Sequence, residues 1–245
     1  MRPDFAENLV ADFWRRVGSE EPFPRHLERS IMLTTPVFVV KVHRQRLDTA
    51  YIRDRLQRRG ISLPMPWAER KLNGCLVAFD GEAAIFLDGT LQADEARVIL
   101  AHEFGHYLAD YEWPRQKALR YFGNDILPVL DGARPAQSAD LLAASLSGLQ
   151  IGAYVHYMDR STDVTIRSLV SHVEDSANAV GAELVAPRKT VFAAMAEHGT
   201  RANTAACSAL LKTQFGLPQA YAALYAAKLM RALRHKRSFT DVLGF

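Results

Sequence analysis

The feature that most constrains this chain is an apolar helical stretch that carries three ionisable side chains. Residues 90–109 are predicted to form one helix, because Thr90 can cap its start and the acids Asp94 and Glu95 lie in its first turn. The segment His-Glu-Phe-Gly-His occupies 102–106 and is flanked by apolar residues on most sides. A helix this apolar is expected to pack into a core, where buried imidazole and carboxylate groups need partners.

The spacing of the two histidines indicates a metal ion as that partner. Residues four apart lie on one helix face, so His102 and His106 can both reach one Zn²⁺ at about 2.0–2.1 Å. Glu103 follows the first histidine and can act as general base toward a water on the metal. The alternative, two surface histidines, is disfavoured by the apolar flanks. We expect one zinc ion per chain, although manganese or iron could compete by availability.

A catalytic zinc takes three protein ligands and keeps one position for water. The long motif with a third histidine is excluded, because Ala109 and Glu112 stand where it requires glycine and histidine. A glutamate on a second helix is the other common solution, and the candidates are Glu112, Glu174 and Glu183. Glu174 is favoured because Asn178, one turn later, could hydrogen-bond a ligand. Glu183 lies about 180° around that helix from Glu174 and is expected to be a solvent-facing or pairing carboxylate.

Two apolar runs before the metal helix predict a β-hairpin over 75–87. Asp80-Gly81 separates the runs, and this dipeptide favours a type I′ turn because both residues need positive φ. The second strand, 82–87, is expected to be an edge strand that could hold an extended peptide through backbone hydrogen bonds. Earlier in the chain we expect helices at 4–18 and 48–59 and a strand at 35–42.

The second half of the chain is predicted to be mostly helical. Helical segments are expected at 115–122, 138–150, 165–186 and 189–233, and 151–158 could be a strand. The fold class is therefore α+β with a helical C-terminal region. We expect a first domain over 1–190 and a helical C-terminal extension over 191–245 that packs on it.

Composition places the chain among ordinary globular proteins. It has 245 residues, a formal net charge of +3 and two cysteines outside any CxxC pair, which makes a cysteine metal site improbable. The absence of a signal peptide or a membrane-spanning apolar run leads us to expect a cytoplasmic protein without membrane contact. Basic clusters at 41–60 and 228–237 are more typical of solvated helix faces than of nucleic-acid patches.

Two motifs together resemble a known family. HEFGHYL, followed by E-x-x-A-N-x-x-x-A-E-L-x-x-P at 174–187, resembles the ImmA/IrrE family of zinc metallopeptidases over roughly residues 45–190. The hairpin before the metal helix matches the family's arrangement. The resemblance implies a zincin-like core, with the active-site helix under a small twisted sheet. It also implies three metal ligands and a catalytic base, namely His102, His106, Glu174 and Glu103.

The resemblance carries an expectation about the substrate. Members of the family typically cleave a DNA-binding repressor or antitoxin, so it implies a protein substrate and a regulatory role. The chain departs from the compact family pattern, because 67 residues separate His106 from Glu174. Residues 111–165 are therefore expected to be an elaborated segment of the metallopeptidase domain.

The expected reaction is amide hydrolysis, which also needs a donor for the developing oxyanion. Candidates are His156, Tyr157 and Tyr154, which cluster in the elaborated segment. One alternative is a DNA-binding regulator with a structural metal and a basic helical C-terminus. Residues 210–229 faintly resemble a helix-turn-helix, but a plain helical hairpin is favoured. Another alternative is a pseudo-enzyme with structural zinc, and an intact Glu103 argues against it.

Overall fold

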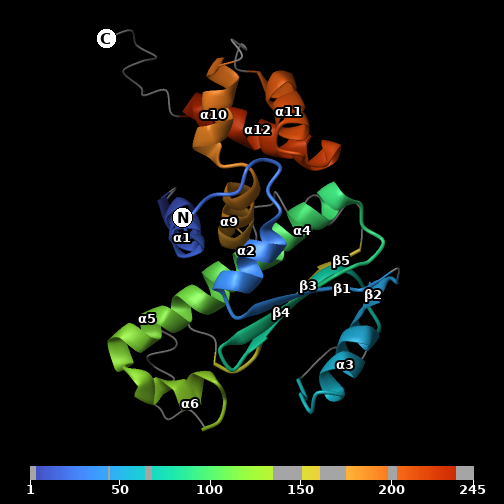
Figure 1. Cartoon of the computed structure of the whole chain (residues 1–245), viewed down its shortest axis with the longest axis vertical. Coiled ribbons are helices and arrows are strands. Elements are labelled where there is room, and N and C mark those ends of the chain that lie inside the picture. The colour runs from blue at the N-terminus through green and yellow to red at the C-terminus, as the bar shows by residue number, and fades with distance from the viewer. Residues whose placement is uncertain are drawn as a thin grey trace.

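The computed structural model describes residues 4–43, 45–63, 68–134, 151–160, 175–197 and 203–235. The fold is mixed α/β, with a five-stranded sheet and helices on both of its faces (Figure 1). The strands are β1 Val37–Lys41, β2 Leu47–Asp48, β3 Lys71–Phe79, β4 Glu82–Leu87 and β5 Tyr154–Asp159. The α-helices are α1 Asp4–Val17, α2 Leu27–Thr34, α3 Thr49–Gln57, α4 Ala93–His106, α5 Trp113–Phe122, α6 Leu127–Leu130, α9 Asp175–Val185, α10 Arg188–Glu197, α11 Thr204–Thr213 and α12 Gln219–His235. A 3₁₀ turn, Asn124–Ile126, precedes α6.

The hairpin predicted before the metal helix is present as β3 and β4. Its turn residues Asp80 and Gly81 have φ of 52° and 80°, as a type I′ turn requires. The two strands pair antiparallel from Gly74–Leu87 to Phe79–Glu82. The local turn signal was therefore sufficient to fix the register of this pair.

The prediction that 82–87 forms an edge strand is wrong. β4 pairs with β3 on one side and, in parallel, with β1 on the other. The strand that borders the sheet beyond β3 is β5, which pairs only with β3 among the described strands. Pairing between β1 and β4 joins segments more than 40 residues apart, so no local pattern could reveal it.

Apolar side chains cover both faces of the central strand β3. Leu76 and Ala78 face the core shared with α1, α4 and α9, whereas Cys75 and Val77 face a second core formed with α3. A strand buried on both faces is continuously apolar rather than alternating. This explains the uninterrupted Cys-Leu-Val-Ala-Phe run that the sequence displays at 75–79.

Helix α4 begins two residues later than the capping pattern suggested. Gln92 is the N-cap of α4, and its backbone N–H donates to Oε2 of Glu95. Thr90 instead bonds the carboxylate of Asp88 through its backbone N–H and its hydroxyl. A buried carboxylate two residues away competed successfully for the hydroxyl that was expected to cap the helix.

Helix α4 passes directly into a π-helical turn, Tyr107–Glu112, and then into α5. The backbone N–H of Trp113 donates to the carbonyl of Leu108, five residues back. Pro114 follows, and a proline cannot donate to the carbonyl four residues before it. A wider turn before the proline accommodates its ring, and such turns are frequent at functional sites.

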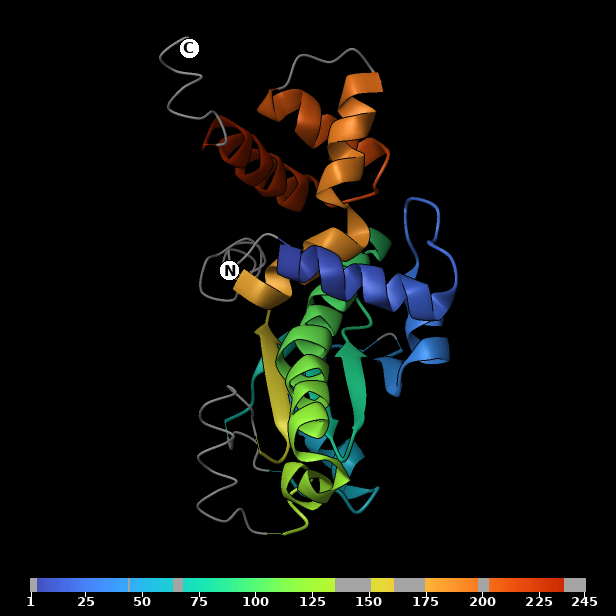
Figure 2. The same ribbon diagram turned by 90° about the vertical axis from the view of Figure 1, so that its left-hand side faces the viewer.

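The C-terminal helices α10, α11 and α12 stand at one end of the molecule, on the far side of α9 from the sheet (Figures 1 and 2). They share the main core with α4 through residues such as Leu211 and Phe215. The turn between α11 and α12 is bound to the body, because the carbonyl of Gly216 accepts a hydrogen bond from Arg97. The segment 210–229 is thus a helical hairpin docked by its turn. No described helix is long and apolar enough to cross a membrane.

Helices α4 and α9 approach each other backbone to backbone. A methyl group added to Gly105 would lie 2.4 Å from the carbonyl oxygen of Ala177, and one added to Gly181 would lie 3.0 Å from that of Ala101. At Gly105 only glycine permits this separation, and at Gly181 a methyl group would require the facing backbone to shift by a few tenths of an ångström. The contact brings the first turns of α9 beside the two histidines of α4.

We expect Gly105→Ala to lower the free energy of unfolding by about 1–3 kcal/mol, because the added methyl overpacks the contact. Intrinsic helix propensity alone predicts the opposite sign, a gain of about 1 kcal/mol. Urea unfolding followed by circular dichroism measures the difference. The control is Ala223→Gly on the exposed side of α12, which should cost about 1 kcal/mol. A stabilised Gly105→Ala protein would contradict the close contact.

Candidate metal centre

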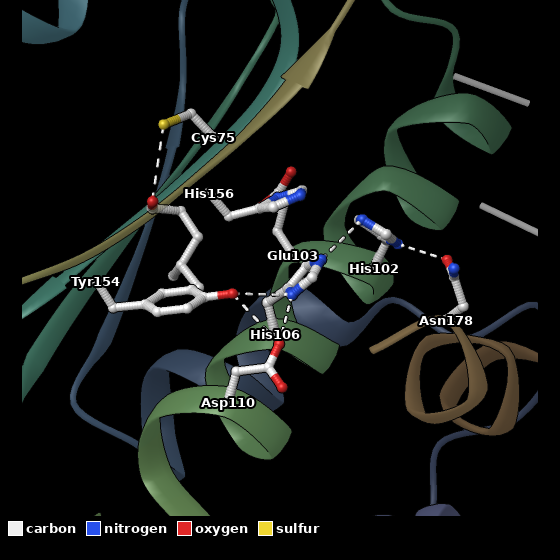
Figure 3. Close-up of polar contacts among 9 residues, drawn as sticks. Cys75, His102, Glu103, His106, Asp110, Tyr154, His156 and Asn178 are labelled. Carbon is white, nitrogen blue, oxygen red and sulfur yellow. Dashed lines mark hydrogen bonds and ion pairs between the residues drawn. The ribbon is translucent and has the colours of Figure 1, made fainter. Parts of the chain in front are cut away.

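The two histidines of α4 are almost fully buried and point toward each other. Their Nε2 atoms lie 3.2 Å apart (Figure 3). The Nδ1 atom of His102 lies 3.0 Å from Oδ1 of Asn178, on α9. The Nδ1 atom of His106 lies 2.7 Å from Oδ2 of Asp110, in the π-helical turn.

These partners fix the tautomer of both imidazole rings. An amide oxygen and a carboxylate oxygen only accept hydrogen bonds, so each Nδ1 carries a proton and donates it. When both rings are neutral, each Nε2 presents a lone pair toward the other, and a cation placed between them would satisfy both. Two imidazoles on one tetrahedral zinc have Nε2 atoms about 3.3 Å apart. The residues present therefore fit a metal ion.

Burial holds His102 in its neutral form. Desolvation lowers the pKa of His102 well below its ordinary value, and the neighbouring His106 and His156 add to this effect. The hydrogen bond with Asn178 acts in the opposite direction. A neutral imidazole is the form that binds metals, so the ligand needs no deprotonation before binding.

Tyr154 lies behind His106, on the side away from Nε2. Its hydroxyl is 3.0 Å from Nδ1 of His106 and donates to Oδ2 of Asp110 at 3.2 Å (Figure 3). Tyr154 is thus brought to the site, but it supports the carboxylate that orients a histidine.

The carboxylate of Glu103 is fully buried between α4 and the sheet. Its Oε2 accepts a hydrogen bond from Nδ1 of His156 at 3.0 Å, and its Oε1 has no hydrogen-bond partner among the described residues. A methyl group on Gly74 of β3 would lie 3.1 Å from Oε1. This glycine, which sequence reasoning missed, lets the carboxylate lie against the strand. A glycine inside an apolar strand is the signal that could have found it.

His156 reaches the centre from the edge strand β5. Together with His102 and His106 it forms a cluster whose ligand atoms lie within 4.8 Å of one another and could hold a metal ion. Its ring stacks on that of His106, with centroids 3.8 Å apart. Two imidazoles bound to one tetrahedral ion have centroids about 5 Å apart. The stacked pair is therefore closer than two ligands of one ion, and in the arrangement seen here Nδ1 of His156 donates to Glu103.

Tyr157 is not brought to the site. Successive side chains of a strand alternate between faces, so Tyr157 points away from the histidines that its neighbour His156 meets. Its ring packs with the second core, beneath α3, and the Arg70 guanidinium lies 5.0 Å from the ring centroid. The expectation that Tyr157 could donate to an oxyanion therefore conflicts with the register of β5.

The three glutamates predicted as candidates for the third metal ligand differ in where they lie relative to the histidines. Glu174 lies outside the described residues. Glu112 forms two hydrogen bonds with Arg16 of α1, at 2.9 and 3.0 Å. Glu183 accepts a hydrogen bond from the backbone N–H of Arg188, as expected for a pairing carboxylate near the helix end. Neither Glu112 nor Glu183 is brought to the histidines.

The fold and the site define a mixed α/β protein with a buried histidine cluster that could hold a metal ion. The chain was compared with protein-family models, with curated proteins and with solved structures, and nothing matched in any of the three comparisons. The resemblance to the ImmA/IrrE family, and with it the zincin-like character of the core, therefore stays a prediction from the two motifs.

We expect Asp110→Asn to weaken metal affinity by about tenfold to a hundredfold, because carboxylates that orient a ligating imidazole make it more basic. Competition with a chromophoric chelator measures the affinity for zinc. Asp125→Asn, on the exposed 3₁₀ turn before α6, removes the same charge away from the site and should leave the affinity unchanged. Equal affinities for the two variants would contradict the orienting role of Asp110.

Proposed function

We propose that this protein is a zinc-dependent endopeptidase that hydrolyses a peptide bond in a regulatory protein. The observation that carries the proposal is the 3.2 Å approach of the two Nε2 atoms, while both Nδ1 atoms are held as donors. The buried, partly unsatisfied carboxylate of Glu103 beside them supports a catalytic rather than a structural ion. A closed structural site needs no base.

His102 and His106 would hold the ion, and the third protein ligand we propose is Glu174. Zinc bound there supplies Lewis acidity, which polarises a carbonyl and lowers the pKa of a water molecule. Asn178 and Asp110 keep the two imidazoles in the tautomer that binds. Asn178 and Asp110 thus orient the two imidazole rings so that both Nε2 lone pairs point to the same position.

Glu103 is the general base in this proposal. His156 holds its Oε2, and its Oε1 is buried against Gly74 without a hydrogen-bond partner among the described residues. Once substrate and water occupy the site, this carboxylate would accept a proton from the attacking water and return it to the leaving amine. Burial against Gly74 excludes bulk water from the carboxylate. Exclusion of water strengthens the electrostatic interactions that the carboxylate makes inside the site.

His156 is the best-placed donor for the charge that develops on the scissile carbonyl oxygen. Its ring lies beside both histidines of α4, with centroids 3.8 and 5.3 Å away. A donor fixed in a buried site stabilises a developing oxyanion without reorganisation. Protonated on both ring nitrogens, the imidazole would donate from Nδ1 to Glu103 and from Nε2 to the oxyanion.

A DNA-binding repressor or antitoxin is the substrate class that the sequence resemblance supports. A reducing, cytoplasmic setting is supported by the two cysteines, Cys75 and Cys207, which are both buried free thiols. The alternative of a DNA-binding regulator has less support. The turn of its proposed helix-turn-helix is packed against Arg97 and Pro24 at Gly216.

We expect Glu103→Gln to bind one zinc per chain and to lose cleavage by a factor of about 10²–10⁴, the usual contribution of a general base. Zinc content is measured by elemental mass spectrometry. Cleavage is measured by the intact mass of a candidate repressor or antitoxin after co-incubation. The proposal is wrong if the wild-type chain carries no metal at neutral pH. It is also wrong if the Glu103→Gln variant cleaves as fast as the wild type.

We expect His156→Phe to keep zinc affinity within a few-fold and to lower kcat about a hundredfold, the usual cost of one lost oxyanion donor. Phenylalanine preserves the stacking on His106 but cannot donate to Glu103. The same chelator competition and cleavage assay report the two quantities separately. If the variant loses its zinc, His156 is a ligand and not a donor.

A further inference from the structure

A cavity of about 460 Å³ lies along α4 toward its N-terminus from the metal centre. Its walls come from α4, from the start of β3, from the turn after β4 and from the N-terminus of α12. Val98 and Ile99 form the side toward α4, and Pro218 and Tyr221 form the opposite side. The volume is typical of ligand pockets in proteins.

Helix α4 carries the proposed catalytic base, Glu103, strand β3 contacts it, and both elements line this cavity. Ile99 lines the cavity and stands one helical turn, about 5.4 Å, before Glu103. Asn73 lines it from β3, and the next residue is Gly74, which lies against the carboxylate of Glu103. An extended peptide advances about 3.3 Å per residue, so two of its residues span one helical turn.

The chemistry of the lining favours an apolar guest. Leu91 joins the four apolar side chains named above. The uncharged polar lining residues are the half-buried Asn73 and the exposed Thr90, Gln92 and Gln219, so the buried part of the lining is mainly apolar. Arg160 also lines the cavity and forms an ion pair with the buried carboxylate of Asp88 through Nη2, while its Nη1 has no hydrogen-bond partner among the described residues. Asp94 and Glu95 are the remaining charged lining residues and would repel an acidic side chain.

From these observations we propose that the cavity is the specificity subsite for a large apolar side chain, such as leucine, methionine or phenylalanine. This side chain would stand about two residues from the scissile bond of the peptide substrate. The inference rests on the proposed endopeptidase function. It also gives the C-terminal helices a role in substrate selection, because α12 supplies one wall of the subsite.

Ala220 provides a way to fill the subsite without touching the metal centre. It lines the cavity from the first turn of α12 and is exposed to solvent, so a larger side chain there can be accommodated without disturbing the core. Ala220→Trp should therefore block the cavity. Ala223→Trp, three residues on and also exposed but outside the lining, is the matched control.

The test uses the zinc-loaded full chain and a library of unstructured peptides randomised around a central position. Cleavage sites of the wild-type protein are aligned by mass spectrometry. We expect leucine, methionine and phenylalanine to be enriched about tenfold over aspartate and glutamate at one position about two residues from the cut. Ala220→Trp should abolish this enrichment while Ala223→Trp keeps it, and both should bind zinc as tightly as wild type. No enrichment, or an unchanged profile in Ala220→Trp, overturns the subsite.

A binding arm separates this inference from the proposed function. The same library is passed over immobilised zinc-loaded Glu103→Gln protein, with and without Ala220→Trp, and the retained peptides are sequenced. If wild type cleaves nothing but the Glu103→Gln protein retains apolar peptides through the cavity, the endopeptidase proposal fails and the subsite stands. If cleavage occurs without selection by the cavity in either arm, the subsite fails and the endopeptidase stands.

Discussion

The close contact between α4 and α9 is the constraint on which the rest of this site depends. Gly105 and Gly181 allow the two backbones to meet, with the Ala177 carbonyl where a side chain would otherwise be. At that separation Asn178 reaches Nδ1 of His102 and fixes its tautomer. A larger residue at either glycine would move α9 outward and leave a buried imidazole without its acceptor, which is costly in a core.

The second histidine is held by an independent route. The π-helical turn that follows α4 places Asp110 against His106, and Tyr154 of β5 closes the network from the sheet. The His102 ring is therefore oriented by an amide of the neighbouring helix α9. The His106 ring is oriented by a carboxylate from the π-helical turn that follows its own helix. Because the two orienting oxygens, Oδ1 of Asn178 and Oδ2 of Asp110, only accept, the two Nε2 lone pairs converge, and this convergence is what fits a cation.

Local patterns predicted the elements that depend on local interactions. The Asp80-Gly81 turn, the strand at 37–41, the helix around His102 and the strand at 154–159 all lie where capping, turn chemistry and periodicity indicated. The wrong predictions concern strand pairing between distant segments and competition between two acceptors for one hydroxyl group. Nothing near 82–87 shows that β1 will pair with it, and nothing near Thr90 shows that a buried Asp88 will take its hydroxyl.

By itself the sequence determined the two histidines and the glutamate of the metal helix, because their spacing on a helix places them without reference to any other element. It also indicated Asn178 through the periodicity of a second helix. Only the tertiary structure decided that His156 faces Glu103 while Tyr157 faces away, because that depends on the register of β5 against β3. The roles of Gly74, Gly105 and Asp110 likewise emerge only when a strand, a helix and a turn meet at one point. Close approach is a property of two segments and cannot be seen in either alone.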